Sequence, residues 1–263
     1  MRHMTLVVMM TLLSAASARA DLKLTQNVSG RGLGMGASSV TVTSIKGLKM
    51  RTDSTAGSTV RTTIFDVENQ KMFIFDSKKK EADVWDMADF GSQMGSSLDT
   101  TGMTASLKPN GQTKEVAGRT ATGYDMSISM PTRLGDPKNG MAMTVKLSGP
   151  TWIVKDAPGT ADFQRFYKGA AEKGFIFSDP RAAKSQPGQA KATTEMYREM
   201  AATGGVPYET EMNITMAGEG PMAAMMARMG NISMTTIVQT AETAELADDL
   251  FAPPVGYKLS PKK

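Results

Sequence analysis

The pattern of apolar and polar positions changes after residue 160. Before it, short runs rich in β-branched and aromatic residues alternate with turn signals, which is typical of an antiparallel sheet and not of alternating strands and helices. Strands are predicted at 22–29, 39–45, 48–51, 59–65, 71–75, 82–85, 114–116, 120–130, 141–147 and 152–154. A short helix is predicted over 87–98. Two strong turn signals, Pro109-Asn110-Gly111 and the segment 136–140, separate the later strands.

After residue 160 the apolar spacing becomes helical. Phe163, Phe166, Tyr167 and Ala170 recur at i, i+3, i+4 and i+7, and Gly174 follows as a helix stop. A polar connection then leads to further predicted elements: a helix over 189–203, a strand over 206–216, a Met-rich helix from 221, a strand over 232–240, a helix over 242–250 and a final strand at 257. The polar connection itself is predicted over 178–188.

Together these elements predict a mainly β (α+β) fold in one domain spanning residues 21–263. We expect a single, strongly curved antiparallel sheet, or half-barrel, with several helices covering its open side. The helical insertions are expected around 160–204 and 220–229. Strands with short turns between them favour this arrangement over a parallel sheet built from alternating strands and helices.

The first 20 residues have the pattern of a cleavable signal peptide. Arg2 and His3 precede an apolar run over 6–13, and Ala18-Arg19-Ala20 forms a cleavage site of the A-x-A type. The run is shorter than the ~20 residues that span a bilayer. We therefore expect a mature chain that begins at Asp21 and lies in a bacterial periplasm, with secretion as the alternative and no transmembrane anchor after cleavage.

Composition removes most catalytic chemistry. The chain has no Cys, and its one His is His3, within the predicted signal peptide. The predicted mature chain therefore lacks the residues for Ser-His-Asp or Cys-His catalysis, for the usual zinc sites and for disulfides. We expect no enzymatic activity, no cofactor and no metal. With 30 Lys and Arg against 26 Asp and Glu, the charge balance also predicts no nucleic-acid partner.

Methionine is the most unusual component, with 23 copies. Three segments, Met126-x-Ile128-x-Met130, Met212-x-Ile214-x-Met216 and Met141-x-Met143, have methionine or another apolar residue at every second position, which places each set on one face of a strand. The candidate lining residues are Met126, Met130, Met141, Met143, Met212 and Met216. Three interpretations remain open: an ordinary core, because Met fills irregular gaps; an adaptable apolar cavity for a lipid-like ligand; and, as a minor alternative, Cu(I) binding by thioethers.

Several short motifs resemble the lipoprotein-localisation-factor superfamily, in particular its uncharacterised periplasmic domain-of-unknown-function branches. Leu48-Lys49-Met50-Arg51 is similar to an early strand that ends in a basic residue, and Ile64 to Asp76 to a central hairpin. Leu250 to Tyr257 resembles the closing strand. The resemblance implies a half-barrel whose cavity binds lipids or acylated proteins, and it places Arg51 at the position of the early-strand arginine of the carriers.

Two hypotheses of function follow. The first is an exported binding or carrier-like protein with an apolar, Met-rich interior for a lipid or another hydrophobic group. The second is a structural or envelope-associated interaction protein without a ligand. A cavity of ~300–1,000 Å³ lined by the Met strands would favour the first, whereas a filled interior with an exposed apolar patch would favour the second.

Overall fold

The computed structural model of the protein describes residues 21–31, 38–97, 102–134, 141–185, 187–218 and 232–262. The predicted signal peptide, the turn at 136–140 and the Met-rich helix around 220–229 lie outside the described residues.

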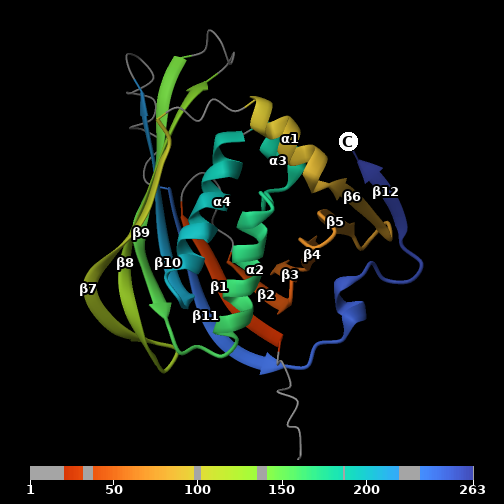
Figure 1. The fold of residues 1–263 in the computed structure, drawn as a ribbon, viewed down its shortest axis with the longest axis horizontal. Coiled ribbons are helices and arrows are strands. Elements are labelled where there is room, and N and C mark those ends of the chain that lie inside the picture. The colour runs from red at the N-terminus through yellow and green to blue at the C-terminus, as the bar shows by residue number, and fades with distance from the viewer. Residues whose placement is uncertain are drawn as a thin grey trace, which may run out of the picture.

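Twelve strands form one open sheet in the order β12-β6-β5-β4-β3-β2-β1-β11-β10-β9-β8-β7 (Figure 1). The strands of the first half are β1 (Asp21–Arg31), β2 (Ser39–Lys46), β3 (Lys49–Ala56), β4 (Thr59–Asp66), β5 (Lys71–Asp76) and β6 (Glu81–Asp86). The others are β7 (Thr104–Val116), β8 (Arg119–Leu134), β9 (Met141–Val154), β10 (Val206–Gly218), β11 (Ile232–Ala244) and β12 (Lys258–Lys262). The prediction of a mainly β fold built on one large sheet is confirmed.

The sheet is not antiparallel throughout. Every neighbouring pair is antiparallel except β12 and β6, which run parallel from Lys258 beside Glu81 to Lys262 beside Trp85. The chain reaches β12 from β11, which lies seven positions away in the strand order, so no hairpin dictates its direction. The antiparallel character that the sequence predicts is confirmed for the other neighbouring pairs, and the edge strand β12 departs from it.

The α-helices of the described residues are α1 (Met87–Ser97), α2 (Thr160–Glu172), α3 (Pro180–Ser185) and α4 (Pro187–Ala202), and η1 (Asp248–Phe251) is a short 3₁₀ helix. Helices α2 and α4 lie side by side (Figure 1). Helix α2 contacts β1 and β2, whereas α4 contacts β7, β8 and β10. No helix in these described ranges has the length and apolarity needed to cross a membrane.

Three local predictions are corrected by the structure. The turn expected at Pro109-Asn110-Gly111 is an irregularity within the edge strand β7, where proline is tolerated and Gly111 takes a φ of 75°. The polar connection over 178–188 contains α3, which starts with Pro180. The helix expected over 242–250 is absent, because β11 continues to Ala244 and only η1 follows.

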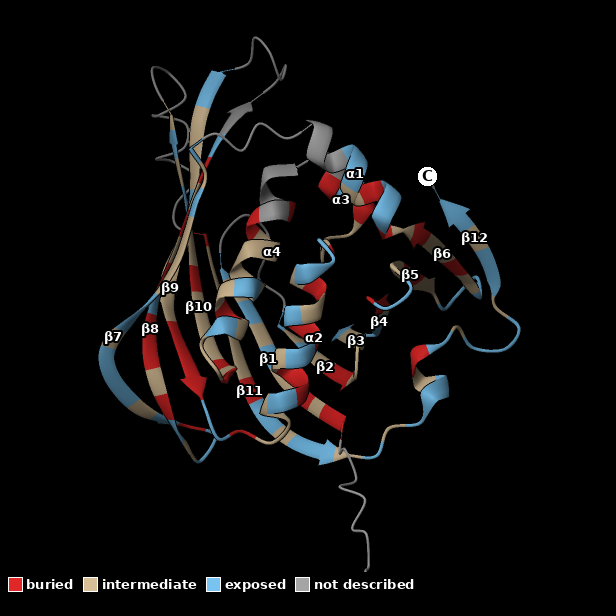
Figure 2. Ribbon diagram, viewed as in Figure 1, coloured by how far each residue is buried: buried red, intermediate tan, exposed pale blue. Residues whose placement is uncertain are grey.

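Two groups of buried side chains fill the space between helices and sheet. We call the first the aromatic core: Phe65, Phe163, Phe166, Tyr167 and Phe175, with Phe177 and Tyr197 packed against them. Its centre is Tyr167 of α2, whose ring stacks on Tyr197 of α4 at 4.7 Å and whose hydroxyl donates to the sulfur of Met50 at 3.6 Å. Burial raises the pKa of Tyr167 well above its ordinary value of 10.0. Buried residues recur along α2 and along the strands behind it (Figure 2).

One buried hydroxyl provides a test of these packing energetics. The Thr151 side chain on β9 is fully buried, and its Oγ1 has no hydrogen-bond partner among the described residues. Because Val has nearly the same shape and needs no partner, we expect Thr151→Val to raise the free energy of unfolding by about 1 kcal/mol in urea denaturation.

The matched control is Thr41→Val. The Thr41 hydroxyl is hydrogen-bonded to the Ser54 hydroxyl at 2.7 Å, so the same substitution removes an interaction there. We expect it to lower stability by about 1 kcal/mol. A destabilised Thr151→Val protein would show that the hydroxyl has a partner of its own.

Candidate functional site

The register of β8, β9 and β10 aligns the methionine-repeat segments of the sequence into rows across the sheet. Directly opposed residues share a face of the sheet. An aliphatic row joins Ile128, Leu147, Ile214 and Ile232 on β8 to β11 in turn. The next row, two residues further along each strand, joins Met130 of β8, Val145 of β9 and Met216 of β10.

On the other side of the aliphatic row lies a second methionine row. Met126 opposes Gly149, and Met212 opposes Met234. Gly149 approaches β10 so closely that a Cβ would lie 2.0 Å from the carbonyl oxygen of Glu211. A side chain is therefore excluded at residue 149. As a result, no side chain of β9 lies between Met126 of β8 and Met212 of β10.

Helix α4 adds methionines from above the sheet. Ala192, Met196 and Met200 recur every four residues and therefore lie along one side of α4. We call the resulting group the methionine cluster. Its buried methionines are Met126, Met130, Met200 and Met212, with Met103, Met196 and Met234 half-buried against them. Ile128, Leu147 and Ala192 complete the buried part.

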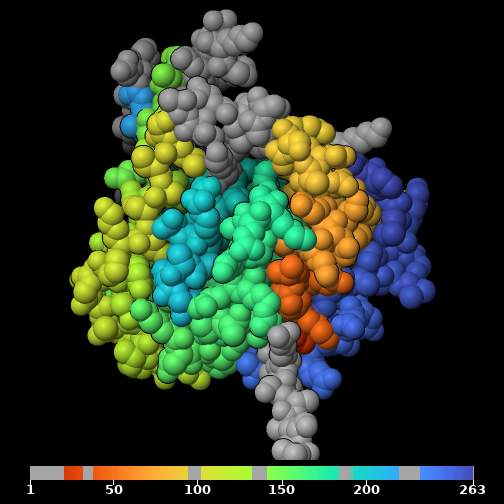
Figure 3. All heavy atoms as spheres, viewed as in Figure 1, coloured from red at the N-terminus to blue at the C-terminus, as the bar shows by residue number. Residues whose placement is uncertain are grey.

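The methionine cluster is closely packed where α4 meets β7 and β8. The space-filling view shows α4 in direct contact with these strands (Figure 3). A pocket at this seam has a volume of about 10 Å³, which is room for about one water molecule. Met126, Met196 and Glu199 are among the residues that line it, and the surface they present to the pocket is apolar. This pocket is far smaller than the ~300–1,000 Å³ typical of ligand sites.

Of the candidate residues, the structure brings Met126, Met130 and Met212 into one buried cluster. Met216 lies in the row of Met130, Met143 lies two residues before Val145 on the same face of β9, and both are half-buried. Met141 lies further out at the start of β9, where it is 51% exposed. The candidate methionines therefore form a gradient from buried to exposed along β8–β10.

Arg51 does not join them. Its neighbour Met50 contacts Tyr167 of α2, and successive residues of a strand point to opposite faces. The Arg51 guanidinium forms two hydrogen bonds with Asp53, at 2.8 and 3.0 Å, and a third with the Leu250 carbonyl of η1 at 3.2 Å. Arg51 thus holds the C-terminal segment against the sheet, away from the methionine cluster.

Sequence reasoning missed the contribution of α4. Met196 and Met200 were not among the candidates, because the period-of-two signal selects strands and passes over a helix. Met234 was missed because its strand, β11, contains no other methionine. The spacing of Ala192, Met196 and Met200 was the available signal, since a four-residue repeat predicts one side of a helix. Nothing in the sequence shows that this side meets the methionine rows.

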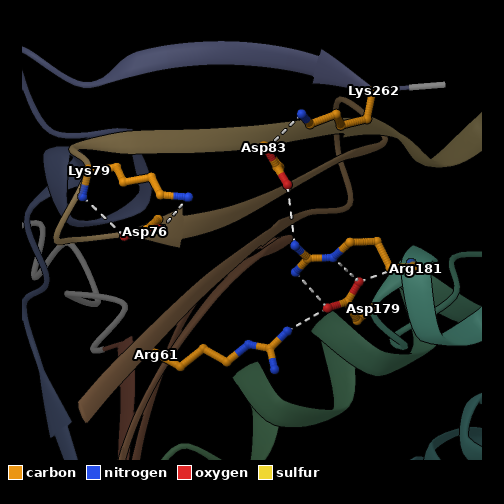
Figure 4. Close-up of polar contacts among 7 residues, drawn as sticks. All are labelled: Arg61, Asp76, Lys79, Asp83, Asp179, Arg181 and Lys262. Atoms are coloured by element: carbon orange, nitrogen blue, oxygen red, sulfur yellow. Dashed lines mark hydrogen bonds and ion pairs between the residues drawn. The ribbon is translucent and has the colours of Figure 1, made fainter. Parts of the chain in front are cut away.

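A chain of alternating charges fixes the start of α3 to the strands at the other end of the sheet (Figure 4). Asp179 accepts hydrogen bonds from the Arg181 guanidinium, at 2.8 and 3.0 Å, and pairs with Arg61 of β4. Arg181 also reaches Asp83 of β6 at 3.4 Å, and Asp83 pairs with Lys262 of β12 at 3.1 Å. We call these five residues the charge clasp.

Asp179 is the centre of the charge clasp. It also accepts a hydrogen bond from the Arg181 backbone N–H at 3.0 Å and so caps α3. Burial opposes its ionisation, but the Arg181 hydrogen bonds and the charges of Arg181 and Arg61 outweigh burial and lower the pKa of Asp179. Helix α3 in turn contacts α4.

No group of His, Cys, Asp and Glu side chains in the described part of the chain is arranged to hold a metal ion. No protein-family model matches the sequence, and no curated protein is significantly similar to it. The methionine cluster is therefore the feature from which a function is inferred.

The charge clasp predicts a defined acid response. Because the pKa of Asp179 is lower in the folded protein than its ordinary value of 3.8, its stabilising effect is complete above pH 3.8 and is lost as the pH falls further. We expect Asp179→Asn to lower stability at pH 7 by no more than about 1 kcal/mol, because its partners are half-exposed.

Urea denaturation at a series of pH values measures this effect. The deficit of Asp179→Asn should shrink as the pH falls below 3.8, and 1 M salt should reduce it at pH 7 by screening. A deficit that is independent of both pH and salt would assign Asp179 to capping alone.

Proposed function

We propose that the protein is an exported binding or carrier-like protein whose methionine cluster accepts a lipid or another hydrophobic group. The observation that carries the proposal is the separate, Met-lined layer between α4 and β7–β11. The flexible thioether side chains can repack around ligands of different shape, which aliphatic side chains of fixed rotamer do less well.

Acceptance of such a group requires α4 to move away from the sheet. The pocket of about 10 Å³ at the α4 seam is too small for an acyl chain. Helix α4 is joined to the aromatic core through Tyr197 and to α3 near the charge clasp, but its own side over the sheet is methionine and alanine. Movement of α4 therefore separates apolar side chains that make no hydrogen bond or ion pair across this layer in the described contacts.

The second candidate is a structural or envelope-associated interaction protein without a ligand. The observation that favours it is the close packing of the same layer, in which the pocket has room for about one water molecule. Under this hypothesis the methionines are core residues and nothing else.

We also propose the architecture and compartment that the resemblance to the lipoprotein-localisation-factor superfamily implies. In Figure 1 the strands pass behind α2 and α4 and continue on both sides of them, which supports a half-barrel with helices over its open side. A signal peptide ending at Ala20 would deliver a chain that starts with β1 at Asp21 to the periplasm.

Binding of a fluorescent fatty-acid probe tests the proposed function. We expect the wild-type protein and the Met130→Leu and Met212→Leu variants to bind the probe with similar affinity, because Leu keeps volume and apolarity at a cost below ~1.5 kcal/mol. Met212→Gln should lose both affinity and ~1–3 kcal/mol of stability, because its amide has no partners there.

Met72→Gln is the matched control. Met72 is 1% exposed and belongs to the buried cluster around the aromatic core, not to the methionine cluster. It should be destabilised in the same way but should bind the probe normally below its melting temperature. Wild-type protein that melts cooperatively and binds no probe would favour the structural hypothesis.

The proposed compartment predicts the N-terminus. Protein extracted from the cell envelope of an expressing bacterium should begin Asp21-Leu22-Lys23 when its N-terminal peptide is sequenced by mass spectrometry. Replacing Ala18 and Ala20 by bulky residues should block cleavage. An intact Met1 on wild-type protein in the cytoplasm would overturn the assignment.

A further inference from the structure

The parallel pairing of β12 with β6 brings two turns together at one edge of the sheet. The first turn, 77–80, connects β5 to β6, and the second, 254–257, leads into β12. Because β6 and β12 run in the same direction and Lys258 lies beside Glu81, both turns stand at the starting ends of these strands (Figure 1). The Lys258 N–H donates to the Lys80 carbonyl at 2.9 Å and joins the two turns directly. We call the two turns together with Lys258 the basic tip.

The second turn holds an apolar side chain out from the protein. The Tyr257 N–H donates to the Pro254 carbonyl at 3.2 Å, and Gly256 takes a φ of 87°, as in a type II turn. Val255, at the second position of this turn, is completely exposed. The ring of Tyr257 packs against that of Phe75 on β5 at 5.7 Å, so the turn is anchored to the sheet. The exposure of Val255 is therefore a property of a fixed turn.

Four exposed lysines surround Val255 in the basic tip: Lys78, Lys79, Lys80 and Lys258. Two carboxylates lie among them. Asp76 pairs with Lys79 at 3.6 Å (Figure 4), and Glu81 pairs with Lys258 at 3.7 Å. Four positive charges against two negative charges leave the basic tip with a net charge of +2.

This combination of charge and apolar surface fits an anionic membrane. Each lysine near such a surface is attracted by its negative potential, and an apolar side chain between the lysines can enter the headgroup region. Leu259, which follows Lys258 in β12 and is 48% exposed, adds apolar surface beside the turn. An acidic protein would also attract the lysines, but a charged surface offers no apolar environment to Val255.

We propose that the basic tip docks the protein on a membrane that contains anionic phospholipids. The lysines lie at the headgroup phosphates, and Val255 enters the interface between them. A net charge of +2 and one fully exposed apolar side chain make the contact weak and reversible, because stable anchoring needs more charge or a longer apolar segment. The docking surface goes beyond the proposed function, since it involves none of the residues of the methionine cluster.

Flotation with lipid vesicles tests the docking surface. We expect the purified wild-type protein to float at low ionic strength with vesicles of equal parts phosphatidylglycerol and phosphatidylcholine, and not with phosphatidylcholine alone. About 1 M NaCl should release it. Lys78→Gln/Lys79→Gln/Lys80→Gln should lower the partition coefficient more than about tenfold, because each lysine near the surface contributes about fivefold. These side chains are exposed, so the melting temperature should not change.

The matched control removes the same charge elsewhere. Lys108→Gln/Lys146→Gln/Lys155→Gln changes three exposed lysines on β7, on β9 and directly after β9. This variant should float as the wild type does. Wild-type protein that shows no preference for the anionic vesicles would overturn the proposal. An equal loss in both triple variants would also overturn it, because net charge and not the basic tip would then determine binding.

Val255→Trp reports on entry into the membrane. The two natural tryptophans, Trp85 and Trp152, are only 5% and 9% exposed, so a new fluorescence change comes from residue 255. Its emission should shift to shorter wavelength with anionic vesicles and stay unchanged with polyglutamate. Binding to polyglutamate through the tip lysines, without binding to vesicles, would replace the membrane by an acidic protein partner.

The fatty-acid probe separates this proposal from the proposed function. The Lys78→Gln/Lys79→Gln/Lys80→Gln variant should bind the probe as the wild type does, because the basic tip and the methionine cluster share no residue. Loss of probe binding in Met212→Gln should in turn leave flotation unchanged below the melting temperature of that variant.

Discussion

The cross-strand register of β8, β9 and β10 is the constraint on which the rest of the structure depends. Ile128, Leu147 and Ile214 oppose one another, and this alignment determines that the flanking methionines also share one face. A slip of one residue would turn every one of these side chains to the other face of the sheet. The close approach of Gly149 to the Glu211 carbonyl helps to fix the alignment, because no other residue fits there.

The two buried groups differ in how specifically they pack. The aromatic core has defined ring geometry, with Tyr167 stacked on Tyr197 and Phe166 edge-on to Tyr167 at 5.1 Å. The methionine cluster is joined mainly by unbranched side chains that adopt many shapes at similar energy. Tyr197 contacts both groups. On α4, therefore, the ring of Tyr197 has a fixed position, whereas the side that carries Met196 and Met200 can adapt its packing.

The features that were predicted correctly from the sequence are those that neighbouring residues determine. Alternation and turn residues located most strands, and the spacing of Phe163, Phe166 and Tyr167 located α2 with the correct side buried. The direction of β12 was missed because it depends on a partner that lies far away in the sequence. Likewise, Met126 and Met212 were found from their period of two, whereas Arg51 was placed with them by resemblance alone and lies against Asp53 and Leu250.

The ends of α4 are held by different kinds of interaction, and this difference bears on how the methionine cluster can be reached. After its C-terminus, Gly205 lies so close to β9 that a Cβ would be 2.5 Å from Ile153 and 2.7 Å from the Val154 carbonyl oxygen. The N-terminus of α4 follows α3, which is held by the ion pair between Asp179 and the half-exposed Arg181. Close packing against backbone resists displacement, whereas exposed ion pairs contribute little and weaken with salt. Any opening of α4 should therefore pivot about Gly205 and begin at the α3 end.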